Sequence, residues 1–197
     1  TVGDNVSNSS NGRKSSIIVN DGKLSIEGGT FTIDSSANNA TIITNTANAS
    51  PVEAKGSKFY VKAMHATGIK ADKAKMELKE LNPANQIVFD VSGDDSIGIN
   101  VNDTASAGLT IYDSGTYTVS GNRSNLIETK KGIKLKADTT HSSTFTASGS
   151  NSNIILATDD GDIDLEKGKF SASGSQSNAI ITTAGKNINI TAKGSKF

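Results

Sequence analysis

The stretch AKGSKF occupies residues 54–59 and recurs 138 positions later, at residues 192–197. Its phenylalanine belongs to a series of seven aromatic residues at intervals of 25 to 30 positions: Phe31, Phe59, Phe89, Tyr117, Phe145, Phe170 and Phe197. A fixed period of this length is the signature of a repeat architecture. We therefore expect the two AKGSKF segments to occupy the same corner of repeats five apart.

Two further series follow the same period. One is an isoleucine in every repeat: Ile18, Ile43, Ile69, Ile99, Ile127, Ile155 and Ile181. The other is a pair of apolar residues with one residue between them: Leu24/Ile26, Val52/Ala54, Met76/Leu78, Leu109/Ile111, Ile133/Leu135, Ile163/Leu165 and Ile188/Ile190. Alternation of apolar and polar positions is typical of a half-buried strand. Each repeat thus contains three short strands.

One such repeat cannot bury its own apolar face, but stacked repeats can, with each strand paired to its counterpart at about 4.8 Å. The sequence predicts an all-β fold, a three-sided parallel β-helix of about seven coils. By analogy with known folds of that kind, we expect it to be right-handed. The Ile and Phe series should form internal ladders.

Two competing repeat folds disagree with the pattern. Leucine-rich repeats need an LxxLxL motif that is missing from this sequence, and a left-handed β-helix of six-residue units would repeat about every 18 residues. A β-sandwich stays open as an alternative, because its strands also turn every eight to twelve residues or so. It would not explain seven isoleucines in register.

Composition narrows the function classes. The 197 residues contain no Cys, and 20 Lys and Arg balance 20 Asp and Glu. With no net charge and no basic block, we expect no nucleic-acid partner. No apolar run approaches the roughly 18 residues of a membrane span, so we expect no membrane insertion of this segment.

The repeats fill residues 1–197 without a second domain, and neither end looks capped. We expect this chain to be a fragment of a longer solenoid, with the remainder of its own chain as a partner at both ends.

The corners between strands differ in length. The corner from aromatic to isoleucine is nearly constant and has the form SGDDS, SGNRS, SGSNS or SGSQS at residues 92–96, 120–124, 148–152 and 173–177. Glycines shortly before the aromatic residue are expected to turn the backbone with positive φ. Longer connections at residues 45–51, 79–86, 102–108 and 136–142 are where insertions that bind partners usually lie.

The segments GGTFTI, SGNRSNLIETKKGIKL, SGSNSNIILATDDGDIDL and SGSQSNAIITTAGKNINI begin at residues 28, 120, 148 and 173. With abundant Ser, Thr, Asn and Gly and no Cys, they resemble the passenger domains of Gram-negative autotransporters and are similar to the filamentous adhesins of two-partner secretion. This resemblance implies type V secretion and extracellular display, anchored at the bacterial outer membrane through a region outside this chain. It also implies adhesion to a protein or glycan receptor on host or other bacterial cells.

Two glutamates are the first candidates for a catalytic site. Glu53 and Glu77 should lie at equivalent outward positions about 5 Å apart, close enough for an acid/base pair of a glycosidase. Lys55 and Lys79 lie two positions further on the same face, so a solvated charge ladder is the favoured interpretation.

The acidic stretch at residues 158–164 could be imagined as a calcium loop, but it lacks the known loop patterns, and a polar corner is favoured. His65 and His141 belong to different repeats. We therefore expect no metal, no cofactor and no catalytic site.

A row of apolar residues beside the isoleucine series is the one candidate binding surface. If the isoleucine series points inward, its neighbours should point outward and form an apolar face interrupted by Gly68 and Gly98. The candidate partner-binding residues are Ile17, Val19, Ile42, Leu126, Ile154, Leu156 and Ile180.

The sequence thus favours a non-enzymatic adhesin scaffold that presents loops and an apolar face. A β-helical polysaccharide lyase or hydrolase, or a purely structural fibre module, remain as alternatives.

Overall fold

The computed structural model describes residues 7–10, 15–46, 51–72, 75–102, 108–112, 114–130, 132–136, 142–183 and 185–197, with side chains from residue 15 onward. The described residues form strands and turns only. The strands make three sheets of seven, and within each sheet every strand pairs with the third strand after it in the chain. All named pairings are parallel, which rules out the β-sandwich alternative.

The first sheet, here called the aromatic sheet, contains the strands of the Phe series. Phe31 to Phe170 are at most 5% exposed, and neighbouring rings stack with centroids 4.5 to 6.0 Å apart along the whole series. Stacked aromatic pairs contribute about 0.5–1.5 kcal/mol beyond the burial of their surface. Its strands are β1 (Ser7–Ser10), β4 (Thr30–Ile33), β7 (Lys58–Val61), β10 (Ile87–Val91), β13 (Gly115–Val119), β16 (Thr144–Ala147) and β19 (Lys169–Ala172).

The second sheet, the isoleucine sheet, follows the short constant corner. Ile43, Ile69, Ile99, Ile127 and Ile155 are register partners and are fully buried. Its strands are β2 (Ser16–Asn20), β5 (Thr41–Asn45), β8 (Thr67–Ala71), β11 (Ile97–Val101), β14 (Asn125–Thr129), β17 (Asn153–Ala157) and β20 (Asn178–Thr182).

The third sheet, the charged sheet, buries the paired apolar series and turns charged residues outward. Its strands are β3 (Leu24–Glu27), β6 (Val52–Lys55), β9 (Met76–Lys79), β12 (Leu109–Tyr112), β15 (Gly132–Lys136), β18 (Gly161–Glu166) and β21 (Ile188–Lys193). The core of the molecule lies between the three sheets.

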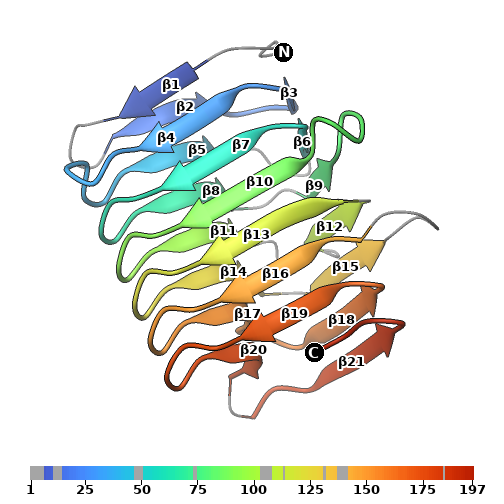
Figure 1. Ribbon diagram of the computed structural model, residues 1–197. Helices are drawn as coiled ribbons and strands as arrows, with labels where there is room; N and C mark the ends of the chain where they lie inside the picture. Colours follow the sequence, from blue (N-terminus) through green and yellow to red (C-terminus); the bar gives the residue numbers. More distant parts are fainter. Residues whose placement is uncertain are drawn as a thin grey trace.

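The chain winds around this core as a right-handed helix. In Figure 1 the front strands run towards the left-hand corner, and the chain returns behind them while it advances from the N-terminal end to the C-terminal end. Strands β2 to β19 form six complete coils, with β1 before them and β20 and β21 after them. The predicted right-handed, three-sided parallel β-helix is confirmed.

The last coil departs from the predicted register. The partner of Ile155 is Ile180, and Ile181 pairs with Leu156. In the charged sheet, Ile163 and Leu165 pair with Ile190 and Ala192. The predicted partners, Ile188 and Ile190, were therefore wrong by two residues. The first error arises because a run of consecutive apolar residues does not show which of them faces the core. The second arises because Ile188, Ile190 and Ala192 alternate with polar residues, so either neighbouring pair of the three fits the pattern.

The AKGSKF segments do occupy one corner. Successive pairings lead from Ala54 through Leu78, Ile111, Leu135 and Leu165 to Ala192, five coils away. Gly56 and Gly194 have φ of 56° and 69°, and the hydroxyls of Ser57 and Ser195 donate to carbonyls of the preceding coil. Positive φ was also expected at Gly115 and Gly168, and this expectation was wrong, because neither glycine has a positive φ. Glycine is needed there because a Cβ would lie 2.5 Å from the rings of Tyr117 and Phe170.

Candidate binding surfaces

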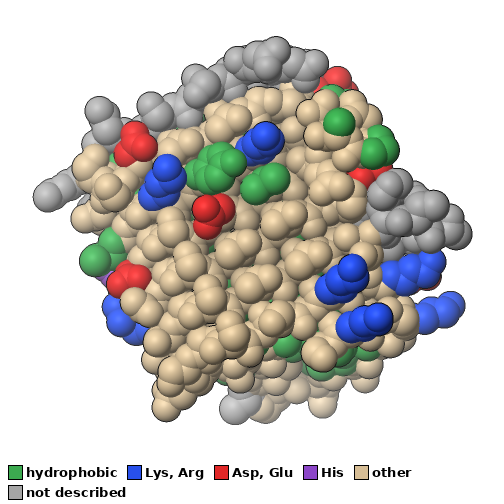
Figure 2. All heavy atoms as spheres, viewed as in Figure 1, with side chains coloured by type: hydrophobic (Ala, Val, Ile, Leu, Met, Phe, Trp, Pro, Cys, Tyr) green, Lys and Arg blue, Asp and Glu red, His purple; other side chains and the backbone are tan. Residues whose placement is uncertain are grey.

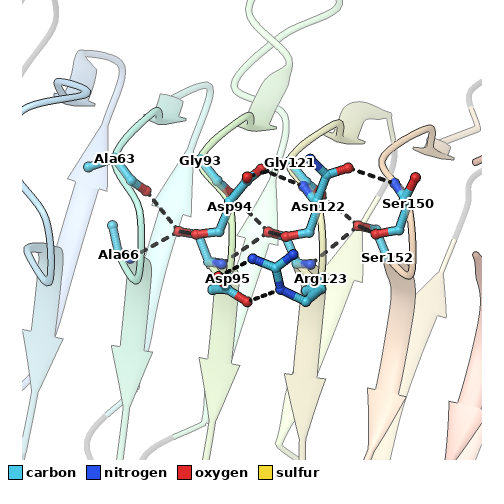
Figure 3. A network of polar contacts seen from close by, with 12 residues as sticks. Ala63, Ala66, Gly93, Asp94, Asp95, Gly121, Asn122, Arg123, Ser150 and Ser152 are labelled. Atoms are coloured by element: carbon cyan, nitrogen blue, oxygen red, sulfur yellow. Dashed lines mark hydrogen bonds and ion pairs between the residues drawn. The ribbon is translucent and has the colours of Figure 1, made fainter.

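The constant corner carries a ladder of serine hydroxyls (Figure 3). The hydroxyls of Ser96, Ser124 and Ser152 donate to the carbonyls of Ala63, Gly93 and Gly121 in the preceding coil, at 2.8, 2.8 and 2.6 Å. Each hydroxyl also accepts the backbone N–H of the residue one coil earlier, at 3.0 to 3.2 Å. Because donor and acceptor capacity are both used between coils, these serines serve the fold.

Charged residues line the outside of this corner. The guanidinium of Arg123 makes two hydrogen bonds of 2.7 Å to the carboxylate of Asp95 in the preceding coil. This contact holds the pKa of Asp95 below its usual value. Asp94 accepts the backbone N–H of Asn122 at 2.7 Å. The corner thus displays a short, mutually bonded polar row (Figure 3).

The apolar stripe predicted on the isoleucine sheet does not exist as an exposed face. Ile42, Leu126 and Ile154 are fully buried, so their predicted outward orientation is wrong. The strands carry two consecutive buried residues, as in the pattern half-buried, buried, buried, half-buried, buried. Register pairing skips the first of the two, which shows that the backbone bends there and that strict alternation begins one residue later.

The remaining residues of the stripe are divided. Ile17 and Ile180 are partly buried against the core. Val19 and Leu156 do occupy outward positions, in β2 and β17, five coils apart; Val19 is 72% exposed. No continuous apolar surface connects them.

Between these two residues the outward column is polar. Its members are Thr44, Lys70, Asn100 and Glu128. Partial burial raises the pKa of Glu128, opposed by a hydrogen bond from Asn125. The amide oxygen of Asn100 is buried without a hydrogen bond to any described atom. Both neighbours of each isoleucine were predicted to point outward, but only the apolar ones were named, so Val19 and Leu156, the two ends of this column, were predicted and its polar members were not.

The N-terminal half of the charged sheet, strands β3, β6 and β9, carries a ladder of ion pairs. We call it the upper half. Glu53 and Glu77 are register partners, as are Lys55 and Lys79. Lys79 contacts Glu53 at 3.0 Å and Glu77 at 2.9 Å, and Lys55 contacts Glu27 and Glu53 at 3.2 and 3.6 Å. The hydrogen bond from Lys79 lowers the pKa of Glu53. The predicted charge ladder is confirmed.

Strands β12, β15, β18 and β21 form the C-terminal half of this sheet, which we call its open half. Tyr112 lies between the ammonium groups of Lys79 and Lys136, 4.8 and 5.5 Å from its ring centroid. Below it is a shallow hollow of about 280 Å³, lined by Lys134, Leu135, Lys136, Asp164, Leu165, Glu166, Thr191 and Lys193. None of its five charged side chains forms an ion pair within the part of the chain that the structure describes. The alternation around Ile133/Leu135 and Ile163/Leu165 could have located this surface in the sequence.

The outer face of the aromatic sheet is mostly uncharged (Figure 2). Lys62 lies 5.9 Å from the ring centroid of Tyr60 near the N-terminal end. Further along, Thr116 and Thr118 pair with Thr144 and Thr146. This face offers hydroxyl groups rather than charge.

The acidic stretch at residues 158–164 is used in contacts to the next coil. Asp159 pairs with Lys186 at 2.7 Å, Asp160 accepts the N–H of Asn187 at 2.7 Å, and Asp162 accepts from the amide of Asn189 at 3.0 Å. Over the described ranges, no group of three or more His, Asp or Glu side chains could hold a metal ion. The interpretation of this stretch as a polar corner agrees with these contacts.

The predicted binding loops are described in part. The connection after β9 folds back on itself, because Leu81 donates its N–H to the carbonyl of Asn85 at 3.0 Å. Residues 47–50, 103–107 and 137–141, which carry most of the other three long connections and include His141, lie outside the described residues.

No helix long and apolar enough to cross a membrane occurs among the described residues. Comparison of the chain with protein-family models, with curated proteins and with solved structures finds no match.

Proposed function

We propose that this chain is a stretch of an extracellular, surface-displayed bacterial β-helical passenger that acts as an adhesin scaffold without catalytic activity. The observation that carries the proposal is the unbroken stack of parallel coils, in which seven strands in each sheet repeat the same outward positions at a fixed spacing. Such a stack presents rows of side chains to large partners rather than enclosing a small substrate. The absence of Cys from the sequence agrees with secretion through a pore, because disulfides formed early would obstruct passage.

The polar outer faces favour a partner with many weak polar contacts, such as a glycan or a protein surface. Hydroxyls line the aromatic sheet, paired charges line half of the charged sheet, and bonded polar groups line the constant corner. Exposed ion pairs and hydroxyls each contribute little, so binding would depend on many copies acting together.

A bead-adhesion assay tests the proposal. Beads coated with the folded chain are incubated with host epithelial cells, with bacterial cells and with immobilised glycans, beside beads coated with serum albumin. We expect retention of the chain-coated beads on at least one of these surfaces. Retention no greater than that of albumin beads on all three would contradict the adhesin function.

A polysaccharide lyase or hydrolase is the alternative that the closeness of Glu53 and Glu77 favours. Incubation with acidic and neutral polysaccharides, with assays for new reducing ends and unsaturated products, distinguishes it. Turnover that is lost on Glu53→Gln or Glu77→Gln would replace the scaffold proposal with an enzyme.

A further inference from the structure

The open half of the charged sheet has a charge pattern that alternates along the stack. We call the last two outward residues of β12, β15, β18 and β21 the open charged face; a third outward residue of β18, Asp162, accepts a hydrogen bond from Asn189 of β21 and is not part of this face. From one strand to the next they are Thr110 and Tyr112, Lys134 and Lys136, Asp164 and Glu166, and Thr191 and Lys193. The row on β12 therefore carries no charge, that on β15 two positive charges, that on β18 two negative charges and that on β21 one positive charge.

These charges are available to a partner. The equivalent side chains in the upper half of the sheet satisfy one another at 2.9 to 3.6 Å. On the open charged face, the lysines and carboxylates of adjacent rows form no ion pair with any residue that the structure describes, and they surround the hollow of about 280 Å³. A ligand of one sign, such as an acidic polysaccharide, would meet Asp164 and Glu166 between the lysines. A partner must therefore carry both signs in rows.

The geometry points to a second copy of this chain as that partner. Consider two copies with their open charged faces together, related by a two-fold axis that runs parallel to the strands between β15 and β18. Rotation about this axis leaves the position along each strand unchanged and inverts the order of the coils. The row of Lys134 and Lys136 then faces the row of Asp164 and Glu166 of the other copy, and the reverse contact forms by symmetry.

The outer rows are compatible with the same arrangement. The row of Thr191 and Lys193 faces the uncharged row of Thr110 and Tyr112, so no like-charged rows meet. Since the axis fixes the position along the strands, Lys134 faces Asp164 and Lys136 faces Glu166 without any sliding. Two copies would make four intermolecular ion pairs.

The charge pattern also selects against the parallel arrangement. A two-fold axis along the stack would place every row against itself, with Lys134 opposite Lys136 and Asp164 opposite Glu166 of the other copy. Like charges at contact distance are destabilising, so the face specifies an antiparallel pair of β-helices.

The association is weak and depends on salt. Four strands about 4.8 Å apart and roughly 13 Å of strand length give a contact of about 250 Å² per copy, well below the roughly 800 Å² per partner of a stable interface. Exposed ion pairs are screened at high ionic strength. We expect dimers only at high chain concentration and low salt. The inference stands independently of the adhesin proposal.

Sedimentation equilibrium of the full chain tests it with charge-reversed rows. The wild type should show a mass that rises from monomer towards dimer up to about 1 mM chain at low salt, and that returns to monomer at about 0.5 M salt. The variant K134D/K136E and the variant D164K/E166K should each weaken association at least tenfold, because each has two rows of the same sign. An equimolar mixture of the two should associate again, since the acidic rows of one match the basic rows of the other. The quadruple variant should also recover.

The matched control is K58E/K169E, which replaces two exposed lysines on the aromatic sheet and changes the net charge by the same amount. It should associate like the wild type. Circular dichroism of each variant confirms that the fold is retained. A wild type that stays monomeric under all these conditions would overturn the inference. Row variants that associate as strongly as the wild type would also overturn it, and would place the contact at the ends of the stack. A mixture of the two row variants that fails to associate would overturn it as well.

Discussion

The rings of Phe145 and Phe170, 25 residues apart in sequence, lie 4.7 Å apart with 4° between their planes. Their strands are register partners, and both side chains are almost fully buried. The same relationship repeats along the entire aromatic series. The interior of the β-helix is therefore a set of ladders in which each side chain is stabilised by its own counterpart in the next coil.

Phe145→Ala should be severely destabilising, because it removes a ring from the middle of the stack and leaves a cavity. We expect a loss of about 3–5 kcal/mol, measured by urea unfolding. Phe197→Ala is the control, since this ring is 66% exposed and contacts the stack on one side; its loss should be less than about 1 kcal/mol. Equal effects of the two substitutions would contradict the buried ladder.

Gly121→Ala should destabilise the constant corner. A Cβ at this position would lie 2.1 Å from the carbonyl oxygen of Gly93, a backbone atom that also accepts from Ser124. We expect a loss of about 1–3 kcal/mol in the same measurement. A Cβ on Gly22 meets nothing within 4 Å and its φ is not positive, so Gly22→Ala should be neutral or slightly stabilising. A tolerated Gly121→Ala would show that the coils are not in this close contact.

Ile154→Ser and Leu156→Ser test which residues of the isoleucine sheet face inward. Ile154 is fully buried, whereas Leu156 is a half-buried residue on the outer face. The first substitution should lower the midpoint of thermal unfolding strongly, with a loss of about 2–5 kcal/mol, and the second by less than about 1 kcal/mol. The reverse order would restore the outward apolar stripe.

Tyr117→Phe should stabilise the protein. The hydroxyl of Tyr117 is buried in the aromatic stack without a hydrogen bond to any described atom, so its removal relieves an unsatisfied polar group. We expect a gain of about 1 kcal/mol in the free energy of unfolding. A loss of stability would reveal a partner for the hydroxyl.

The same residue makes stability fall at alkaline pH. Burial raises the pKa of Tyr117 far above the usual value of 10.0, so its phenol stays neutral in the folded state and ionises only on unfolding. The resulting stabilisation is complete below pH 10 and is lost as the pH rises above this value. Urea unfolding at pH 8 and about pH 11 should show a smaller alkaline loss for Tyr117→Phe than for the wild type.

Much of the fold could be predicted from the sequence, because equivalent positions of successive coils stack on one another and therefore carry the same type of side chain. An aromatic residue stacks best on an aromatic residue, and the period of Phe31 to Phe197 is therefore visible as a repeat. Likewise Glu53 and Lys79 sit at alternating positions around buried Ala54 and Leu78, and their ion pair followed from that alternation.

The orientation of neighbouring apolar residues could not be predicted in the same way. Ile42 and Ile43, or Ile180 and Ile181, are alike in sequence, and only the local bend after the corner decides that both Ile42 and Ile43 face the core. For this reason the expected apolar face was wrong. The polar column with Glu128 does follow the predicted alternation, but only its apolar ends, Val19 and Leu156, were named as outward residues. The open charged face joins four strands, β12, β15, β18 and β21, and the wrong register predicted for Ile188/Ile190 hid its last row, Thr191 and Lys193.

Distances between spin labels test the central claim, that equivalent positions of successive coils lie directly over one another. The chain has no native cysteine, so label pairs can be placed at Lys58 with Thr116, Thr144 or Lys169, all outward positions of one register column. With the labelled chain diluted in unlabelled protein, we expect separations of about 10, 14 and 19 Å, an increase of about 4.8 Å for each coil. Separations that do not grow by a constant step from coil to coil would contradict the stacked β-helix.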